Sequence, residues 1–265
     1  MTDAGDRSEL ARLDAQRLNA RLRLSGLVAT AVFLVMVASD LLMVTTLDFS
    51  RSYSFWTDAP GLPQRQVTVG YYLGILTIPF YVVGGWHLSL TIRPAGAWAS
   101  RWVVVAIGYI ACLCTVWHAS FAFTRSILRA ELAAGASVSP GPEAVLAFGT
   151  YALPLFRFGL GVAGSAFLLT FGLAVLGRTH YPRWAGVALP ALYLLVAVLL
   201  GPYVPVWAAV VLRAGGWNVG GVAVFALSTV LLWNAPKAVD ASRPGGRSGH
   251  DEALSTPSSR PPCPS

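Results

Sequence analysis

The chain has 265 residues, of which 55% are apolar and only 12% are charged. Soluble domains carry about 25% charged residues, so this composition excludes an ordinary water-soluble domain. The formal net charge of +7 does not indicate nucleic-acid binding, because the basic residues lie at the ends of apolar runs instead of forming one basic face. Basic residues in those positions face anionic lipid headgroups, so the expected partner is a lipid bilayer.

Residues 1–23 are polar and contain both acidic residues and arginines. Four leucines recur among them at roughly helical spacing: Leu10, Leu13, Leu18 and Leu22. This pattern predicts an amphipathic helix that lies in the cytosol against the lipid headgroups.

Apolar runs of the length that a helix needs to cross roughly 30 Å of hydrocarbon fill residues 24–236. Lipid offers no partner to an unpaired backbone group, so a helix is the natural way for each run to cross. The sequence therefore predicts an all-α fold, a polytopic transmembrane helical bundle with six spans. The predicted spans are 25–47, 68–92, 102–124, 150–177, 184–201 and 218–235.

The fourth run allows two interpretations. Its apolar character extends from Glu143 to Gly177 and is interrupted by Pro154. One interpretation is a kinked helix whose first turns, residues 144–152, lie at the outer surface; the other is a helical hairpin, which gives seven spans. Two full spans need about 40 residues and a turn, so six spans are favoured. The segment 202–217 is expected to be either a loop or a re-entrant piece.

Basic residues in the loops predict the orientation of the spans. With a cytosolic N-terminus, 13 of the 19 basic residues fall in inner segments and 5 in outer segments, while Arg157 lies inside a run. This asymmetry favours both termini in the cytosol, which agrees with an even number of spans. The outer basic residues are Arg51, Arg65, Arg125, Arg129 and Arg213.

Residues 237–265 are rich in Pro, Ser and Gly and are predicted to form a disordered cytosolic tail. The cysteines carry no functional signal. Cys112 and Cys114 lie two residues apart on one predicted helix, so their side chains point to different sides, and Cys263 lies in the tail. Zinc-type spacing does not occur, and the sequence predicts neither a metal ion nor a cofactor.

Four ionisable residues stand inside the apolar runs, where each costs from a few to about ten kcal/mol unless it meets a partner or a water-filled cavity. Asp40 lies roughly 22 Å along the first span and His118 roughly 24 Å along the third, both in the outer half at 1.5 Å per residue. Arg157, near the outer start of the fourth span, shares this level. His87 lies near the cytosolic end of the second span.

We expect Asp40, His118 and Arg157, with Asn218 at the outer end of the last span, to line a pocket that opens to the outside. An Asp40–Arg157 ion pair would cancel both charges, and His118 could join it by a hydrogen bond. The arginine suits an anionic ligand. His118 and Asp40 are the candidate catalytic pair for acid–base chemistry, and His87 is a secondary candidate.

Each of these residues also has a structural interpretation. A buried Asp–Arg pair can serve only to orient two helices, and an intramembrane histidine is commonly satisfied by a backbone carbonyl or a hydroxyl group. Asn218 suits an N-cap of the last span, and Trp217 beside it suits an interfacial anchor.

Two small-residue motifs, Gly70-x-x-x-Gly74 and Gly161-x-x-x-Ser165, have the spacing that lets helices approach closely. Internal packing explains them, and a homo-oligomer face is the alternative.

Several local sequences resemble a family of bacterial multi-pass membrane proteins that is catalogued as a domain of unknown function. They are ASDLLM around Asp40, PFYVVGGWHLSLTIRPAG around His87, WHASFAF around His118 and NVGGVAVFALSTVLLWN in the last span. The resemblance covers about residues 25–235. It implies a location in the bacterial inner (plasma) membrane and a polar site at these positions, but it supplies no reaction.

Three functions therefore remain open. The first is binding or transport of a small or lipid-like ligand in the outward-facing pocket. The second is an intramembrane enzyme that acts on a lipid-like substrate with His118 and Asp40 as acid and base. The third is a structural or assembly protein whose buried polar groups only hold helices together.

Overall fold

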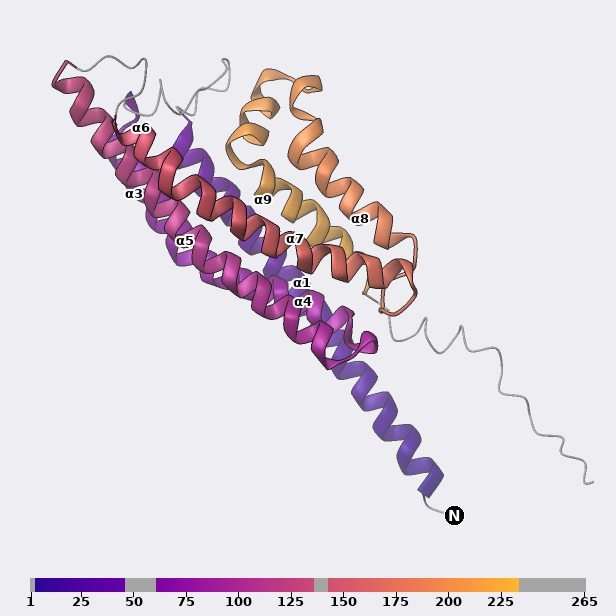
Figure 1. Ribbon diagram of the computed structural model, residues 1–265. Helices are drawn as coiled ribbons and strands as arrows, with labels where there is room; N and C mark the ends of the chain where they lie inside the picture. Colours follow the sequence, from indigo (N-terminus) through magenta and orange to yellow (C-terminus); the bar gives the residue numbers. More distant parts are fainter. Residues whose placement is uncertain (1–2, 46–60, 136–142, 234–265) are drawn as a thin grey trace, which may run out of the picture.

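The computed structural model describes residues 3–45, 61–135 and 143–233, and throughout these ranges the regular elements are helical (Figure 1). The predicted tail, residues 237–265, lies outside the described residues. The α-helices are α1 (Asp3–Val44), α3 (Gln64–Thr77), α4 (Tyr81–Thr91), α5 (Ala97–Ala133), α6 (Glu143–Ala147), α7 (Leu153–Val175), α8 (Ala185–Leu194) and α9 (Val206–Leu231).

Among the residues that the structure describes, five helical segments are long and apolar enough to cross a membrane, which confirms the all-α bundle and indicates an integral membrane protein. The fifth predicted span, 184–201, is shorter than expected. It consists of the ten-residue α8 and a five-residue π-helical turn, Leu195–Leu199, together about 22 Å long. The five long segments are Arg12–Val44, Gln64–Thr91, Ala97–Ala133, Val145–Val175 and Val206–Leu231.

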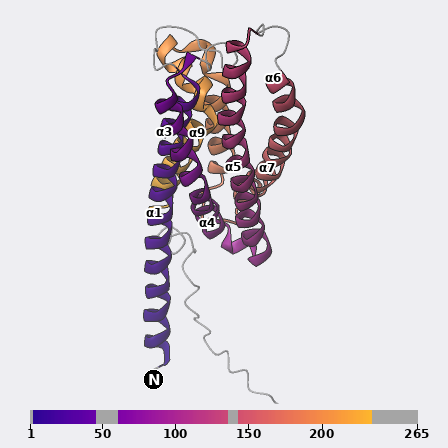
Figure 2. The same ribbon diagram turned by 90° about the vertical axis from the view of Figure 1, so that its left-hand side faces the viewer.

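The polar N-terminal segment is continuous with the first span. Helix α1 runs without a break from Asp3 to Val44 and projects beyond the other helices at its N-terminal end (Figure 2). Residues 6–25 contain neither Gly nor Pro and are rich in Leu, Ala and Arg, which are strong helix formers, so nothing interrupts the helix where the chain turns apolar.

The fourth run forms one helical segment, so the hairpin interpretation with seven spans is wrong. Helix α6 continues through a π-helical turn, Phe148–Ala152, into α7. Pro154 stands in the first turn of α7. Proline has no backbone N–H, so the widened π turn directly before it accommodates the lost hydrogen bond without ending the helix.

The last helix begins earlier than the predicted span. Helix α9 starts at Val206, so most of the segment 202–217 is helical, and the helix bends at Gly215, whose φ of −130° and ψ of 23° are not helical. Asn218 consequently lies inside α9, and the N-cap interpretation of this residue is wrong.

Helix α1 packs along α9, α3 and α4, while α5 packs against α4 and α7, and α8 packs against α7 and α9 at the edge of the bundle (Figures 1 and 2). The end of α9 meets α1 at the start of its apolar stretch. The Arg23 guanidinium donates two hydrogen bonds, of 2.9 and 2.7 Å, to the Trp233 carbonyl oxygen and lies 4.6 Å from the centre of the Trp233 ring. Asp40, 17 residues further along α1, therefore lies far from this end of the bundle.

Candidate functional site

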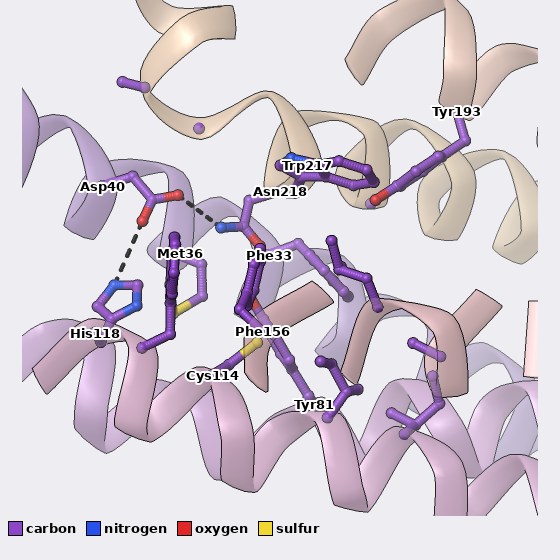
Figure 3. Close-up of a pocket in the computed structure, with 18 of the residues that line it drawn as sticks. Phe33, Met36, Asp40, Tyr81, Cys114, His118, Phe156, Tyr193, Trp217 and Asn218 are labelled. Atoms are coloured by element: carbon purple, nitrogen blue, oxygen red, sulfur yellow. Dashed lines mark hydrogen bonds and ion pairs between the residues drawn. The ribbon is translucent and has the colours of Figure 1, made fainter. Parts of the chain in front are cut away.

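Three of the predicted site residues come together from three different helices (Figure 3). Asp40 lies near the end of α1, His118 in α5 and Asn218 in α9. The Asn218 Nδ2 donates a hydrogen bond of 2.7 Å to Asp40 Oδ2. The His118 Nε2 lies 3.4 Å from Asp40 Oδ1. Asp40 is therefore the centre of a polar network that joins α1, α5 and α9.

Two residues that the sequence did not single out extend this network. The Tyr81 hydroxyl donates to Asn218 Oδ1. The Ser39 hydroxyl donates to the Gly70 carbonyl oxygen at 2.7 Å and lies 3.3 Å from His118 Nε2. Because the Ser39 hydrogen is already used, Ser39 accepts from His118, so His118 Nε2 carries a hydrogen. Both His118 and Asn218 therefore direct donors at the Asp40 carboxylate.

Glycines allow the helices to approach closely at this network. A Cβ atom at Gly74 of α3 would lie 2.6 Å from Ser39 Oγ and closer still to the His118 ring, and one at Gly215 would lie 3.3 Å from Asp40 Oδ2. The Gly70-x-x-x-Gly74 motif thus serves packing inside the bundle, since a Cβ at Gly70 would meet the α1 backbone within 2.9 Å. Around Gly161, by contrast, the space is open.

The network faces a cavity of about 290 Å³ between α1, α5, α7 and α9. Asp40 and His118 lie at one end of this cavity and Tyr193 at the other (Figure 3). Nine of its 24 lining residues are aromatic, so the walls are apolar but rich in ring faces. Phe33 stacks on Tyr81 at a centroid distance of 4.7 Å, and Trp117 stacks on Phe156 at 4.1 Å.

Arg157 does not line this cavity, which corrects its prediction as a ligand-binding residue. It is exposed on α7, whereas Phe156, Leu160 and Ala163 of the same helix line the cavity. Successive helical residues turn by about 100°, so the residue after Phe156 points well away from that face. In the described part of the chain, Asp40 pairs with His118 and not with Arg157.

His87 belongs to a separate, fully buried cluster near the other end of the bundle and does not line the cavity. Its Nδ1 lies 3.0 Å from Ser25 Oγ and its Nε2 2.7 Å from Ser228 Oγ, which in turn lies 2.6 Å from the Tyr181 hydroxyl. Ser25 donates to the Arg21 carbonyl oxygen at 2.7 Å.

These contacts fit one directed chain of donors, from Tyr181 through Ser228 and His87 to Ser25. Burial raises the pKa of Tyr181 to about 12, although the hydrogen bonds with Ser228 and Thr91 lower it, so the hydroxyl keeps its proton at neutral pH. Both ring nitrogens of His87 are thereby satisfied, which favours a structural role for this histidine.

Arg125 was expected in an outer loop but is buried on α5, with 1% of its surface exposed. Its guanidinium donates to Gln64 Oε1 at 2.7 Å and to the Leu62 carbonyl oxygen. The α5 helix continues nine residues past the predicted end of the third span because the segment 125–133 consists largely of helix formers.

Trp217 was expected to be an interfacial anchor but lines the cavity (Figure 3). Cys114 also lines it, whereas Cys112 is exposed, as expected for side chains on different sides of one helix. Within the described ranges, no three His, Cys, Asp or Glu side chains lie together in a way that could hold a metal ion.

Comparison with known proteins relates the chain to one described family. The model of a family of unknown function, DUF6796, matches residues 15–237. No curated protein and no solved structure matches significantly. The matched range contains every residue that lines the cavity and agrees with the resemblance seen in the sequence. The chain therefore belongs to DUF6796, a family of unknown function.

Proposed function

We propose that this protein binds a small or lipid-like ligand in the cavity beside Asp40 and carries it into or across the bacterial inner membrane. In this proposal the chain has six spans and cytosolic termini, so the cavity lies in the outer half of the bilayer and faces outward. The polar end of the ligand meets Asp40, His118 and Asn218, and its apolar body lies among the aromatic side chains.

One observation carries the proposal: the Asp40 network borders an open cavity instead of a filled interface. Protein interiors pack with few voids larger than a water molecule, and a cavity of about 290 Å³ is close to the lower limit of ordinary ligand pockets. A purely structural Asp–His contact would favour complete burial, but 14% of the Asp40 side-chain surface remains exposed.

A neutral aromatic probe, 4-phenylbutanol, tests the proposal in its simplest form. Binding is measured by calorimetry on the protein in phosphatidylcholine nanodiscs, with empty nanodiscs subtracted. The variant Ala163→Phe places a ring into the cavity from α7, since Ala163 lines it. We expect saturable binding to the natural chain and at least a tenfold loss in Ala163→Phe. Equal binding to both proteins, or binding to neither, would contradict the proposal.

The enzyme remains the second candidate because His118 and Asp40 border the same cavity with an Nε2–Oδ1 distance of 3.4 Å. A histidine that donates to a carboxylate has the arrangement of an acid–base pair. This candidate predicts that deletion of the gene changes the lipid composition and that His118→Ala has the same effect. An unchanged lipid profile in both strains would leave binding or transport as the better proposal.

A further inference from the structure

The charged side chains around the cavity restrict the chemical class of the ligand more than the volume of the cavity does. Among the described lining residues, Asp40 is the acidic one, His118 is the one imidazole, and neither lysine nor arginine contributes. Arg157 is exposed on another face of α7, and Arg213 directly precedes the lining residue Ala214 without lining the cavity itself. Within the described part of the chain, the cavity therefore offers a ligand an anionic group and an imidazole, but no lysine or arginine side chain.

The Asp40 carboxylate also has unused capacity to accept hydrogen bonds. A carboxylate offers about four lone-pair positions, and the contacts at Asp40 come from Asn218 at 2.7 Å and His118 at 3.4 Å. The His118 contact is longer than a charge-assisted hydrogen bond, which is about 2.7–2.9 Å. A further donor can therefore reach the carboxylate from the cavity.

The aromatic walls of the cavity also favour a ligand that carries a positive charge. Ring faces carry partial negative charge and attract cations that lie within about 6 Å of the ring centre. Trp217, Phe33 and Tyr81 line the cavity close to Asn218 (Figure 3). Trp117 and Phe156 also line it, as a stacked pair. Aromatic rings beside one carboxylate form an arrangement that recognises an ammonium group attached to an apolar body.

We infer that the ligand is a lipophilic amine in its protonated form, with the ammonium group against Asp40 and the hydrocarbon or aromatic body between the rings. This inference rests on the proposed function and names its ligand class. An ammonium ion enters an apolar cavity at a high desolvation cost unless it meets a counter-charge, which Asp40 supplies. An anionic ligand would instead meet the like charge of Asp40. The cavity therefore favours a cationic ligand, whereas the predicted role of Arg157 favoured an anionic one.

Three probes that share one body test the inference: 4-phenylbutylamine, 4-phenylbutanol and 4-phenylbutyrate, which are cationic, neutral and anionic at neutral pH. Their affinities are measured by calorimetry in nanodiscs of zwitterionic phosphatidylcholine, against empty nanodiscs. We expect the amine to bind at least about tenfold more tightly than the alcohol, which corresponds to about 1.4 kcal/mol, and the carboxylate to bind most weakly.

Asp40→Asn keeps the size of the side chain and one accepting oxygen, replaces the other oxygen with an NH2 group that donates, and removes the charge. We expect the affinity of this variant for the amine to fall to its affinity for the alcohol. The affinity for the alcohol should stay unchanged, which shows that the cavity is intact. Arg157→Gln is the matched control and should leave all three affinities unchanged. The comparison of the three probes on the natural chain stands even if Asp40→Asn does not fold.

An alcohol that binds as tightly as the amine, or a carboxylate that binds most tightly, overturns the amine inference but leaves a ligand site in place. Amine binding that persists undiminished in Asp40→Asn, with the alcohol also bound, overturns it as well. Failure of all three probes contradicts the proposed function itself. The two failures are therefore distinguishable.

Discussion

Asn218 connects the two parts of the polar network, since it donates to Asp40 and accepts from Tyr81. Replacement with leucine keeps a similar side-chain volume but removes both hydrogen bonds. The Asp40 carboxylate and the Tyr81 hydroxyl then lose a partner in a poorly solvated place, which costs about 1–3 kcal/mol each when the group stays unsatisfied. We expect Asn218→Leu to lower the free energy of unfolding by at least about 2 kcal/mol, measured by SDS titration in mixed micelles.

Tyr81→Phe is the matched control for this prediction. It removes one hydrogen bond and leaves Asn218 in contact with Asp40, so a loss of about 1 kcal/mol is expected. If Asn218→Leu costs no more than Tyr81→Phe, the Asn218–Asp40 hydrogen bond does not contribute to stability, and the network is weaker than its geometry indicates.

That Asp40, His118 and Asn218 share one level of the bundle was predictable from the sequence, but which side chains at that level turn toward one another was not. A helix rises 1.5 Å per residue, so a count from the start of each span placed Asp40, His118 and Asn218 at one level. The same count placed Arg157 at that level, yet Arg157 points away from the cavity. The direction depends on which neighbours a helix packs against, and no pattern in a uniformly apolar helix reveals that.

The packing of α3 against α1 and α5 depends on glycine. In Gly74→Ala the new methyl group would overlap the His118 ring and Ser39 Oγ, so His118 must move and the polar end of the cavity must change. We expect a loss of about 1–3 kcal/mol in the free energy of unfolding and weaker binding of the amine probe. SDS titration and calorimetry measure the two effects.

Gly161→Ala is the matched control on α7, because Gly161 has open space around its Cα atom. Alanine is the better helix former, so this variant should be as stable as the natural chain or more stable, by up to about 1 kcal/mol. If Gly74→Ala and Gly161→Ala change the free energy of unfolding equally, the close approach of α3 to α1 and α5 does not depend on glycine at position 74.

The presence of the membrane-spanning helices was predictable from the sequence, because a single polar residue hardly changes the mean hydropathy of a span. Their ends were not. Helix α1 includes residues 3–23 of the polar segment, α5 extends past residue 124, and α9 begins at Val206 instead of 218. Lipid requires only that residues within the hydrocarbon be helical, and residues outside it continue the helix wherever propensity allows. Apolarity therefore marks the membrane-embedded part of a helix and not its end.

At the scale of the whole molecule, the Asp40 network and the His87 cluster are buried polar groups that lie apart from each other. The Asp40 network borders a cavity, whereas the His87 cluster is closed and hydrogen-bonded at both ring nitrogens. Phe225 lies between them: it lines the cavity, stacks on Phe33 at 5.2 Å and meets the His87 ring edge-on at 5.9 Å. Because the two groups are separate, polar side chains can stay open to the cavity without loss of the hydrogen bonds that hold α1, α4 and α9 together.

The number of spans determines whether both ends of the chain lie on the same side of the membrane, and α8 decides between five and six. Its helix and π turn reach about 22 Å, less than the roughly 30 Å of hydrocarbon, but local thinning of the bilayer accommodates a short span at modest cost. The contact of Arg23 with Trp233 brings the start of the apolar stretch of α1 to the end of α9. Six spans and a cytosolic C-terminus are therefore expected.

Reporter fusions test this expectation, since green fluorescent protein exported in unfolded form fluoresces only in the cytosol and alkaline phosphatase is active only outside it. After Ser265, the fluorescent fusion should be bright and the phosphatase inactive. After Gly201, where α8 and its π turn have ended, the pattern should be reversed if α8 crosses. Phosphatase activity at Ser265 would instead mean that the C-terminus lies outside the cytosol. Because the residues up to Val175 would keep their orientation, α8 would then not cross, and only the five long segments would span the membrane.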